Sequence, residues 1–159
     1  VDAEGRVVVA DYGNHRVQVL GDDGRAVQVI GGGPGKEDGS FYGPRGVATL
    51  EGGAVAVADQ HNHRVQIFAP SGALLRVIGS QGGGPGQFRY PAQLAPHGPG
   101  QLAVADSCNG RVQVVSVADG SLVRELPLEG GGSPLGVAIG ADGAVVAADF
   151  KNHRITVMD

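Results

Sequence analysis

The side chains best suited to chemistry in this chain recur at a nearly fixed spacing. Aspartate stands at Asp11, Asp59, Asp106 and Asp149, which are 48, 47 and 43 residues apart. An asparagine follows each aspartate after three residues, at Asn14, Asn62, Asn109 and Asn152. An arginine follows after five, at Arg16, Arg64, Arg111 and Arg154. Carboxylates and amides of this kind bond turn amides, and a guanidinium can fork back onto the carboxylate, so we interpret all of these residues as structural.

Histidine is the other candidate for chemistry. Three of the five histidines share one position of the repeated motif, namely His15, His63 and His153. The third unit has Gly110 at that position, and His61 and His97 are isolated. No Ser-His-Asp order and no pair of carboxylates stands out, so we expect no catalytic residue, no metal and no cofactor in this chain. Cys108 is the only cysteine, which excludes an internal disulfide.

The elements that carry these residues are short strands. In the second unit a run over 46–50 precedes a glycine turn, and further strands are predicted over 54–59, 64–68 and 74–79. The equivalent strands of the first unit are predicted over 6–10, 16–20 and 27–30. No segment has a helical period. A repeat of about 40–50 residues built from short strands is typical of a propeller blade, and radial stacking would bury both faces of each sheet.

The repeated strings resemble the NHL repeat. They read N-H-R-V-Q-V or N-H-R-V-Q-I with V-A-D upstream, and G-G-G-P-G-Q-F-R-Y-P over 82–91 is the fullest form of the link between units. The resemblance covers essentially the whole chain. It implies an all-β fold, a β-propeller of NHL type, as an incomplete arc of about four blades of short antiparallel four-stranded sheets. We place the repeats at 1–32, 41–80, 88–128 and 133–159.

The first and last repeats are expected to be incomplete. Val1-Asp2 resembles the tail of a first strand, and Asp159 is expected to close a third strand. This gives three, four, four and three strands in the successive units. Such propellers usually close with about six blades, and an open arc would leave unpaired strand edges, so we expect the rest of the propeller from the same chain.

Composition weighs against nucleic acid as the partner. The chain has 12 lysines and arginines against 16 aspartates and glutamates, a net charge of −4, whereas nucleic-acid-binding domains normally carry a basic surplus. An RNA-binding NHL domain is therefore our second alternative. No apolar run approaches the roughly 18 residues of a membrane span, and no signal peptide is visible. The compartment is not determined by the sequence, although we favour the cytoplasm.

The resemblance also allows a test for catalysis. NHL-like lyases place a metal-binding histidine directly after the proline that opens an inner strand. The corresponding positions here hold Arg45, Ala92 and Leu135, none of which can act as an imidazole ligand. An enzyme or small-ligand sensor of the lyase type, with its site in blades outside this chain, remains the first alternative.

The expected function is protein binding. By resemblance, the binding surface lies where the links and the second-to-third-strand turns leave the sheets, so we expect a cluster of Tyr42, Arg45, His61, Arg89 and Tyr90. The tyrosines could instead fill gaps between blades. We expect a non-catalytic interaction propeller within a larger protein or assembly. It would serve as a scaffold or as a recruitment module like those of ubiquitin ligases, with a protein partner of acidic or carbonyl-rich surface.

Overall fold

The computed structural model describes residues 1–2 and 4–158, which form four antiparallel sheets. The first sheet contains β1 (Val7–Asp11), β2 (Arg16–Leu20) and β3 (Ala26–Gly31). The second contains β4 (Pro44–Thr49), β5 (Val55–Asp59), β6 (Arg64–Phe68) and β7 (Leu74–Ile78). The third contains β8 (Pro91–Pro96), β9 (Gln101–Asp106), β10 (Arg111–Ser116) and β11 (Leu122–Pro127). The fourth contains β12 (Pro134–Ile139), β13 (Val145–Asp149) and β14 (Arg154–Met158). This confirms the expected all-β class and the strand numbers of the four units.

Every sheet is a meander in which neighbours in sequence are neighbours in space. The motif aspartate and arginine form the last residue pair of the hairpin that each repeat makes with its second and third strands. In β1–β2 this pair is Asp11 and Arg16, and in β5–β6 it is Asp59 and Arg64. Short 3-10 turns make this connection at η1 (Tyr12–Asn14), η3 (Gln60–Asn62) and η4 (Ser107–Asn109). A fourth turn, η2 (Glu51–Gly53), connects β4 to β5. None of the helices in the described residues is long and apolar enough to cross a bilayer.

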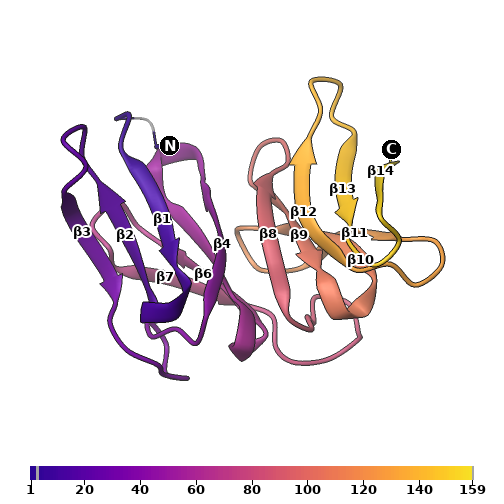
Figure 1. Ribbon diagram of the computed structural model, residues 1–159, viewed down its shortest axis with the longest axis horizontal. Coiled ribbons are helices and arrows are strands. Elements are labelled where there is room, and N and C mark those ends of the chain that lie inside the picture. Colours follow the sequence, from indigo (N-terminus) through magenta and orange to yellow (C-terminus); the bar gives the residue numbers. More distant parts are fainter. Residues whose placement is uncertain (3, 159) are drawn as a thin grey trace.

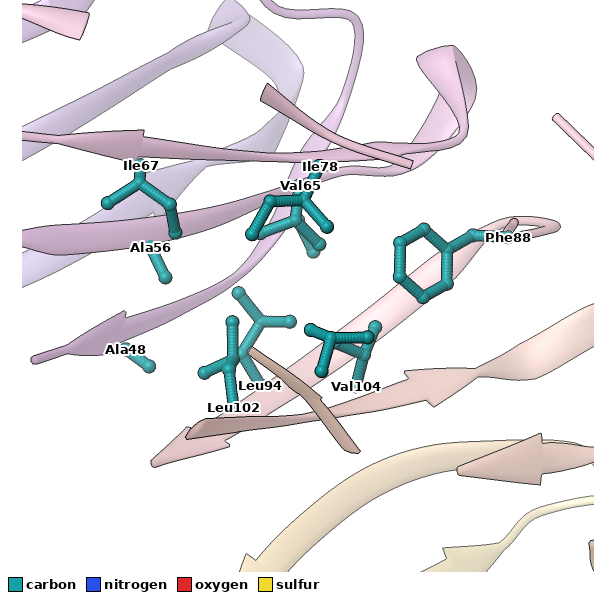
Figure 2. Close-up of a cluster of buried hydrophobic side chains, with 11 residues drawn as sticks. Ala48, Ala56, Val65, Ile67, Ile78, Phe88, Leu94, Leu102 and Val104 are labelled. Carbon is teal, nitrogen blue, oxygen red and sulfur yellow. The ribbon is translucent and has the colours of Figure 1, made fainter. Parts of the chain in front are cut away.

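The sheets stack face to face along the chain (Figure 1). Figure 2 shows the packing between the second and third sheets, where Val65 and Ile67 of β6 face Leu94 and Val104 of the next sheet. Phe88, from the link between these sheets, is fully buried in the same cluster. Small branched side chains therefore form the core between blades, and one phenylalanine from the link closes it.

Strand β6 shows why apolar residues occur at both odd and even positions of a strand, so that both faces of the sheet are apolar. All five of its residues are buried, because one face packs against the third sheet and the other against the first. The inner strands of the second and third sheets also approach each other closely. A Cβ atom on Gly46 would overlap the carbonyl oxygen of Ala92, so only glycine fits there.

The observed strands differ from the predicted ones by one or two residues at several ends. β4, β5 and β7 cover 44–49, 55–59 and 74–78 where 46–50, 54–59 and 74–79 were predicted, and β1 begins at residue 7 instead of residue 6. β1 ends at Asp11 instead of residue 10, because Asp11 pairs with Arg16, and β3 is one residue longer at each end than predicted. Val1 and Asp2 do not lie in a strand. Asp2 instead closes a turn, accepting the backbone N–H of Arg6 on its carboxylate at 2.8 Å. The expected strand end at Asp159 lies outside the described residues.

Candidate functional site

Each motif aspartate lies at the centre of a hydrogen-bond network. In the second sheet Asp59 is fully buried. Its Oδ2 accepts hydrogen bonds from Asn62, Arg64 and Gln66, over 2.8, 2.8 and 3.2 Å. Its Oδ1 accepts the backbone N–H of Tyr42 at 2.7 Å. Four donors thus satisfy a carboxylate that has no access to water.

The donors of this network also hold the backbone of the incoming link. Arg64 Nη2 donates to the carbonyl oxygens of Glu37 and Ser40, over 2.8 and 3.1 Å. The amide of Gln66 donates to the Ser40 carbonyl and accepts the N–H of Gly39, both over 2.8 Å. The motif residues therefore fix the course of the link.

The third sheet repeats this arrangement. Asp106 is fully buried and accepts hydrogen bonds from Arg111 Nε at 2.8 Å and from the N–H of Arg89 at 2.7 Å. Gln113 Nε2 donates to the Gln87 carbonyl at 2.7 Å. The same side chains thus hold two successive links in the same way.

The fourth sheet keeps the carboxylate although its link is shorter. Asp149 accepts the N–H of Ser133 at 2.9 Å, Asn152 at 2.8 Å and Arg154 Nε at 3.2 Å. Burial opposes charge on this carboxyl, but the hydrogen bonds outweigh it and lower the pKa of Asp149. The network therefore favours the charged carboxylate.

The turn after the aspartate ends in a left-handed residue. His15 and His63 have φ of 54° and 56°, a region that a side chain adopts only where contacts support it. His15 Nδ1 accepts the N–H of Gly43 at 3.0 Å, and His63 Nδ1 accepts the N–H of Tyr90 at 3.0 Å. Because a backbone N–H can only donate, Nδ1 is the acceptor in both bonds. Both histidines tie a turn to the following link.

Six rings form a continuous array, here called the aromatic platform, made of Tyr12, His15, Tyr42, His61, His63 and Tyr90. His61 lies at its centre, with ring centroids 5.9, 5.0 and 5.6 Å from those of Tyr12, Tyr42 and Tyr90. The Tyr12 hydroxyl is 2.7 Å from His61 Nε2. Turns and links supply all six rings, so the platform lies at the end of the sheets where both emerge.

Gly43 makes room for the platform. A Cβ atom there would lie 2.6 Å from Cδ2 of His61 and 2.9 Å from Cε2 of Tyr12. In the next link the equivalent residue is Tyr90, which adopts φ 53° and adds a ring of its own. The link before β4 therefore leaves room for the rings at Gly43, and the link before β8 adds a further ring to the platform at Tyr90.

The structure brings three of the five predicted partner-binding residues together. Tyr42, His61 and Tyr90 are in ring contact, and the tyrosines are 45% and 40% exposed. Arg89 is exposed beside Tyr90 in the link. Arg45 is exposed at the start of β4, and within the described residues no ring contact or hydrogen bond joins its side chain to the platform.

Electrostatics at the platform favour neutral His63. Burial lowers the pKa of His63, and the charges of His61 and Arg89 lower it further, against the opposite effect of two motif aspartates. Beside this ring lies an open hollow of about 240 Å³, lined by Lys36, His61, Asn62, His63, Arg64 and Gln81. The platform thus borders a hollow that contains the basic side chains of Lys36 and Arg64 together with polar donors.

Sequence reasoning missed two groups of residues. It did not place Tyr12, His15 and His63 in a common array, because the contacts join different repeats. It also overlooked the motif glutamines, Gln18, Gln66 and Gln113. Their signal was present, since glutamine stands seven residues after the aspartate in each of the first three repeats.

The positions compared with lyase ligands show no metal-binding arrangement. Ala92 is fully buried, and Leu135 packs against the core between the third and fourth sheets. In the part of the chain that the structure describes, no group of three histidine, cysteine, aspartate or glutamate side chains is arranged to hold a metal ion. Cys108 is exposed with a free thiol.

Comparison with known families matches the NHL repeat at residues 1–20, 41–68 and 132–158. The third unit, which has Gly110 in place of the motif histidine, falls outside the matched ranges. No curated protein sequence matches the chain.

Solved structures show the same fold. The chain is similar to streptogramin B lyase, with a TM-score of 0.77 and 19% identity over 100% of this chain and 52% of the other. It is also similar to a chain of the nidogen/laminin complex, with a TM-score of 0.73 and 21% identity over 100% of this chain and 57% of the other. A gluconolactonase from Xanthomonas campestris matches with a TM-score of 0.69 and 21% identity, over 92% of this chain and 53% of the other. The chain spans about half the length of these structures, and the likeness shows that its sheets are part of a β-propeller.

Proposed function

Since the chain belongs to the NHL-repeat family and exposes three tyrosine rings around His61, we propose that it is a non-catalytic protein-interaction module. The exposed platform carries this proposal. Tyr12, Tyr42 and Tyr90 are 45%, 45% and 40% exposed, although rings of this size are normally more deeply covered. Tyrosine is among the residues that most often anchor protein interfaces.

The rings are also held in place before any partner arrives. His61 contacts all three tyrosines, and its Nε2 is hydrogen-bonded to Tyr12. A surface whose side chains are already ordered loses little conformational entropy on binding, which favours affinity. This supports a docking role over the alternative in which Tyr42 and Tyr90 only fill gaps between blades.

The chemistry around the platform indicates the kind of partner. Tyrosine hydroxyls and the nearby Arg89 and Lys36 are hydrogen-bond donors, so they suit an acidic or carbonyl-rich protein surface. The net charge of −4 supports protein over nucleic acid. We propose recruitment, as in ubiquitin ligases, or scaffolding within a larger protein or assembly, with the cytoplasm as its location.

The residues at the lyase ligand positions support a non-catalytic role for this part of the propeller. Arg45, Ala92 and Leu135 provide no imidazole, and Ala92 is closed off in the core. The pair Tyr42 and Tyr90 is therefore a better target for a functional test than any candidate catalytic group.

The test is affinity capture from lysate with quantitative mass spectrometry. The Tyr42→Ala/Tyr90→Ala variant is expected to lose about tenfold or more of the specific partner. The matched control is Leu75→Ala/Val123→Ala, which removes apolar groups that are 59% and 50% exposed on outer strands away from the platform. Melting curves must show that both variants fold. If the tyrosine variant retains the same proteins as the wild type, the proposal is wrong.

A further inference from the structure

Tyr90 is held in the aromatic platform by a buried histidine. His63 is 8% exposed, and its Nδ1 accepts the backbone N–H of Tyr90 at 3.0 Å. The two rings also pack edge to face, with centroids 4.5 Å apart and planes at 85°. Tyr90 itself adopts φ 53°, a left-handed conformation that a residue with a side chain keeps only where its contacts hold it. The position of the Tyr90 ring therefore depends on His63.

The preceding residue of the same link is held by a different kind of acceptor. The backbone N–H of Arg89 donates to Oδ1 of the fully buried Asp106 at 2.7 Å. A carboxyl group keeps an acceptor oxygen whether it is charged or protonated. An imidazole accepts only at an unprotonated ring nitrogen, and both nitrogens of its charged form are donors. Two successive N–H groups of one link therefore differ in whether protonation removes their acceptor.

Protonation of His63 would place two donors face to face. A proton on Nδ1 would point at the N–H of Tyr90, which has no lone pair to accept it. The hydrogen bond between His61 Nε2 and the Tyr12 hydroxyl has no such restriction, because a hydroxyl can donate or accept. Acid therefore breaks the hydrogen bond between His63 and Tyr90, whereas the one between His61 and Tyr12 can persist.

The charged groups around His63 come from its own turn, from the links on both sides and from β5, β6 and β9, and they are Lys36, Asp59, His61, Arg64, Arg89 and Asp106. Burial has the largest effect and lowers the pKa of the His63 ring. The charges of His61 and Arg89 lower this pKa further, and the two aspartates oppose them. The ring therefore takes up its proton below the ordinary histidine value of 6.5, in acidic solution.

We propose that His63 is a pH-sensitive switch for the aromatic platform, in which the neutral ring holds Tyr90 in the platform and the protonated ring releases it. In neutral solution three tyrosines surround His61, and in acid Tyr12 and Tyr42 remain. Release of a bound partner in acid follows from this and rests on the function proposed above. The switch itself is a property of the free chain.

The test compares the backbone amides of Tyr90 and Arg89 by NMR in the isotope-labelled chain, between about pH 7.5 and 4.5 and without any partner. The protection of the Tyr90 amide against hydrogen exchange, relative to an unstructured peptide at the same pH, should fall about tenfold. This loss should occur in step with the titration of the His63 ring nitrogens. The Arg89 amide should keep its protection over the same range, because its carboxyl acceptor remains.

His63→Asn should abolish the response of the Tyr90 amide, because an amide side chain does not titrate. His153→Asn is the matched control and should respond like the wild type, since His153 has a similar left-handed backbone, with φ 50°, but is exposed in the fourth repeat. Because no partner takes part, failure here leaves the proposed function to the capture experiment. Parallel behaviour of the Tyr90 and Arg89 amides in the wild type, or an unchanged Tyr90 response in His63→Asn, would overturn the switch.

Discussion

A Cβ atom placed on Gly110 would lie 2.9 Å from the carbonyl oxygen of Gly132, in the shortened link to the fourth sheet. In the first two repeats this position is a histidine whose ring accepts an N–H from the following link. The short link therefore runs beside the backbone where an imidazole would begin. The missing histidine of the third repeat and the shortened link that follows are two parts of one structural change.

This relationship predicts the cost of a side chain at residue 110. Gly110 and Gly24 both have positive φ, at 66° and 75°, but a Cβ on Gly24 would meet no atom within 4 Å. We expect Gly24→Ala to lower the free energy of unfolding by about 1 kcal/mol, from backbone conformation alone. Gly110→Ala should cost about 3 kcal/mol, because the link must also move. Denaturant unfolding measures both, and equal losses would show that the link adapts freely.

The motif carboxylates should differ in their contribution to stability. Asp59 is fully buried with four donors, whereas Asp11 is partly exposed and holds no link. Asp59→Ala should lower the free energy of unfolding by about 3 kcal/mol, because it leaves the buried Arg64 and Gln66 without their common acceptor. Asp11→Ala should have a smaller effect in the same denaturant experiment. The opposite order would contradict the role of the link in burying the network.

The lowered pKa of His63 predicts that the stability of the protein depends on pH. Burial lowers its pKa below the value of 6.5 that applies in the unfolded chain, so the folded protein favours the neutral ring. The stabilisation is complete above pH 6.5 and is lost as the pH falls below it, because the unfolded chain takes up the proton first. His63→Asn keeps a side-chain acceptor and suits the left-handed backbone. As the pH is lowered from about 6.5 to 5, the free energy of unfolding of the His63→Asn variant should fall less than that of the wild type. Parallel curves for the two proteins would contradict this.

The Tyr12 hydroxyl should control the orientation of the central histidine. Tyr12→Phe removes the hydrogen bond to His61 Nε2. Since this bond is solvent-exposed, the melting temperature should fall by no more than about 2 °C. The ring ¹⁵N shifts of His61 should nevertheless change. Tyr90→Phe is the control, because its ring contacts His61 but no hydrogen bond of its hydroxyl occurs within the described residues. Unchanged shifts in Tyr12→Phe would show that the ring contacts alone hold His61.

The repeat could be predicted accurately from the sequence, because the spacing of Asp, Asn and Arg marks the same hairpin in each unit. β2 and β6 lie where alternation predicted them, over Arg16–Leu20 and Arg64–Phe68. The platform was harder to predict. Contacts of His61 with Tyr12 and Tyr90 join residues of three repeats, and they depend on how far adjacent blades are rotated. That rotation follows from core packing and link length together.

The aromatic platform is proposed to bind protein through anchored tyrosines and not through phosphate contacts. The most direct measurement is the affinity of the captured partner for the wild-type chain and for Arg89→Glu, over about 0.05 to 0.5 M salt after nuclease treatment. We predict that binding survives the nuclease, weakens only modestly with salt, and falls in Arg89→Glu by less than in the Tyr42→Ala/Tyr90→Ala variant. A steep log-linear loss of affinity with salt, or disappearance of binding after nuclease treatment, would contradict protein binding at the platform and indicate nucleic acid.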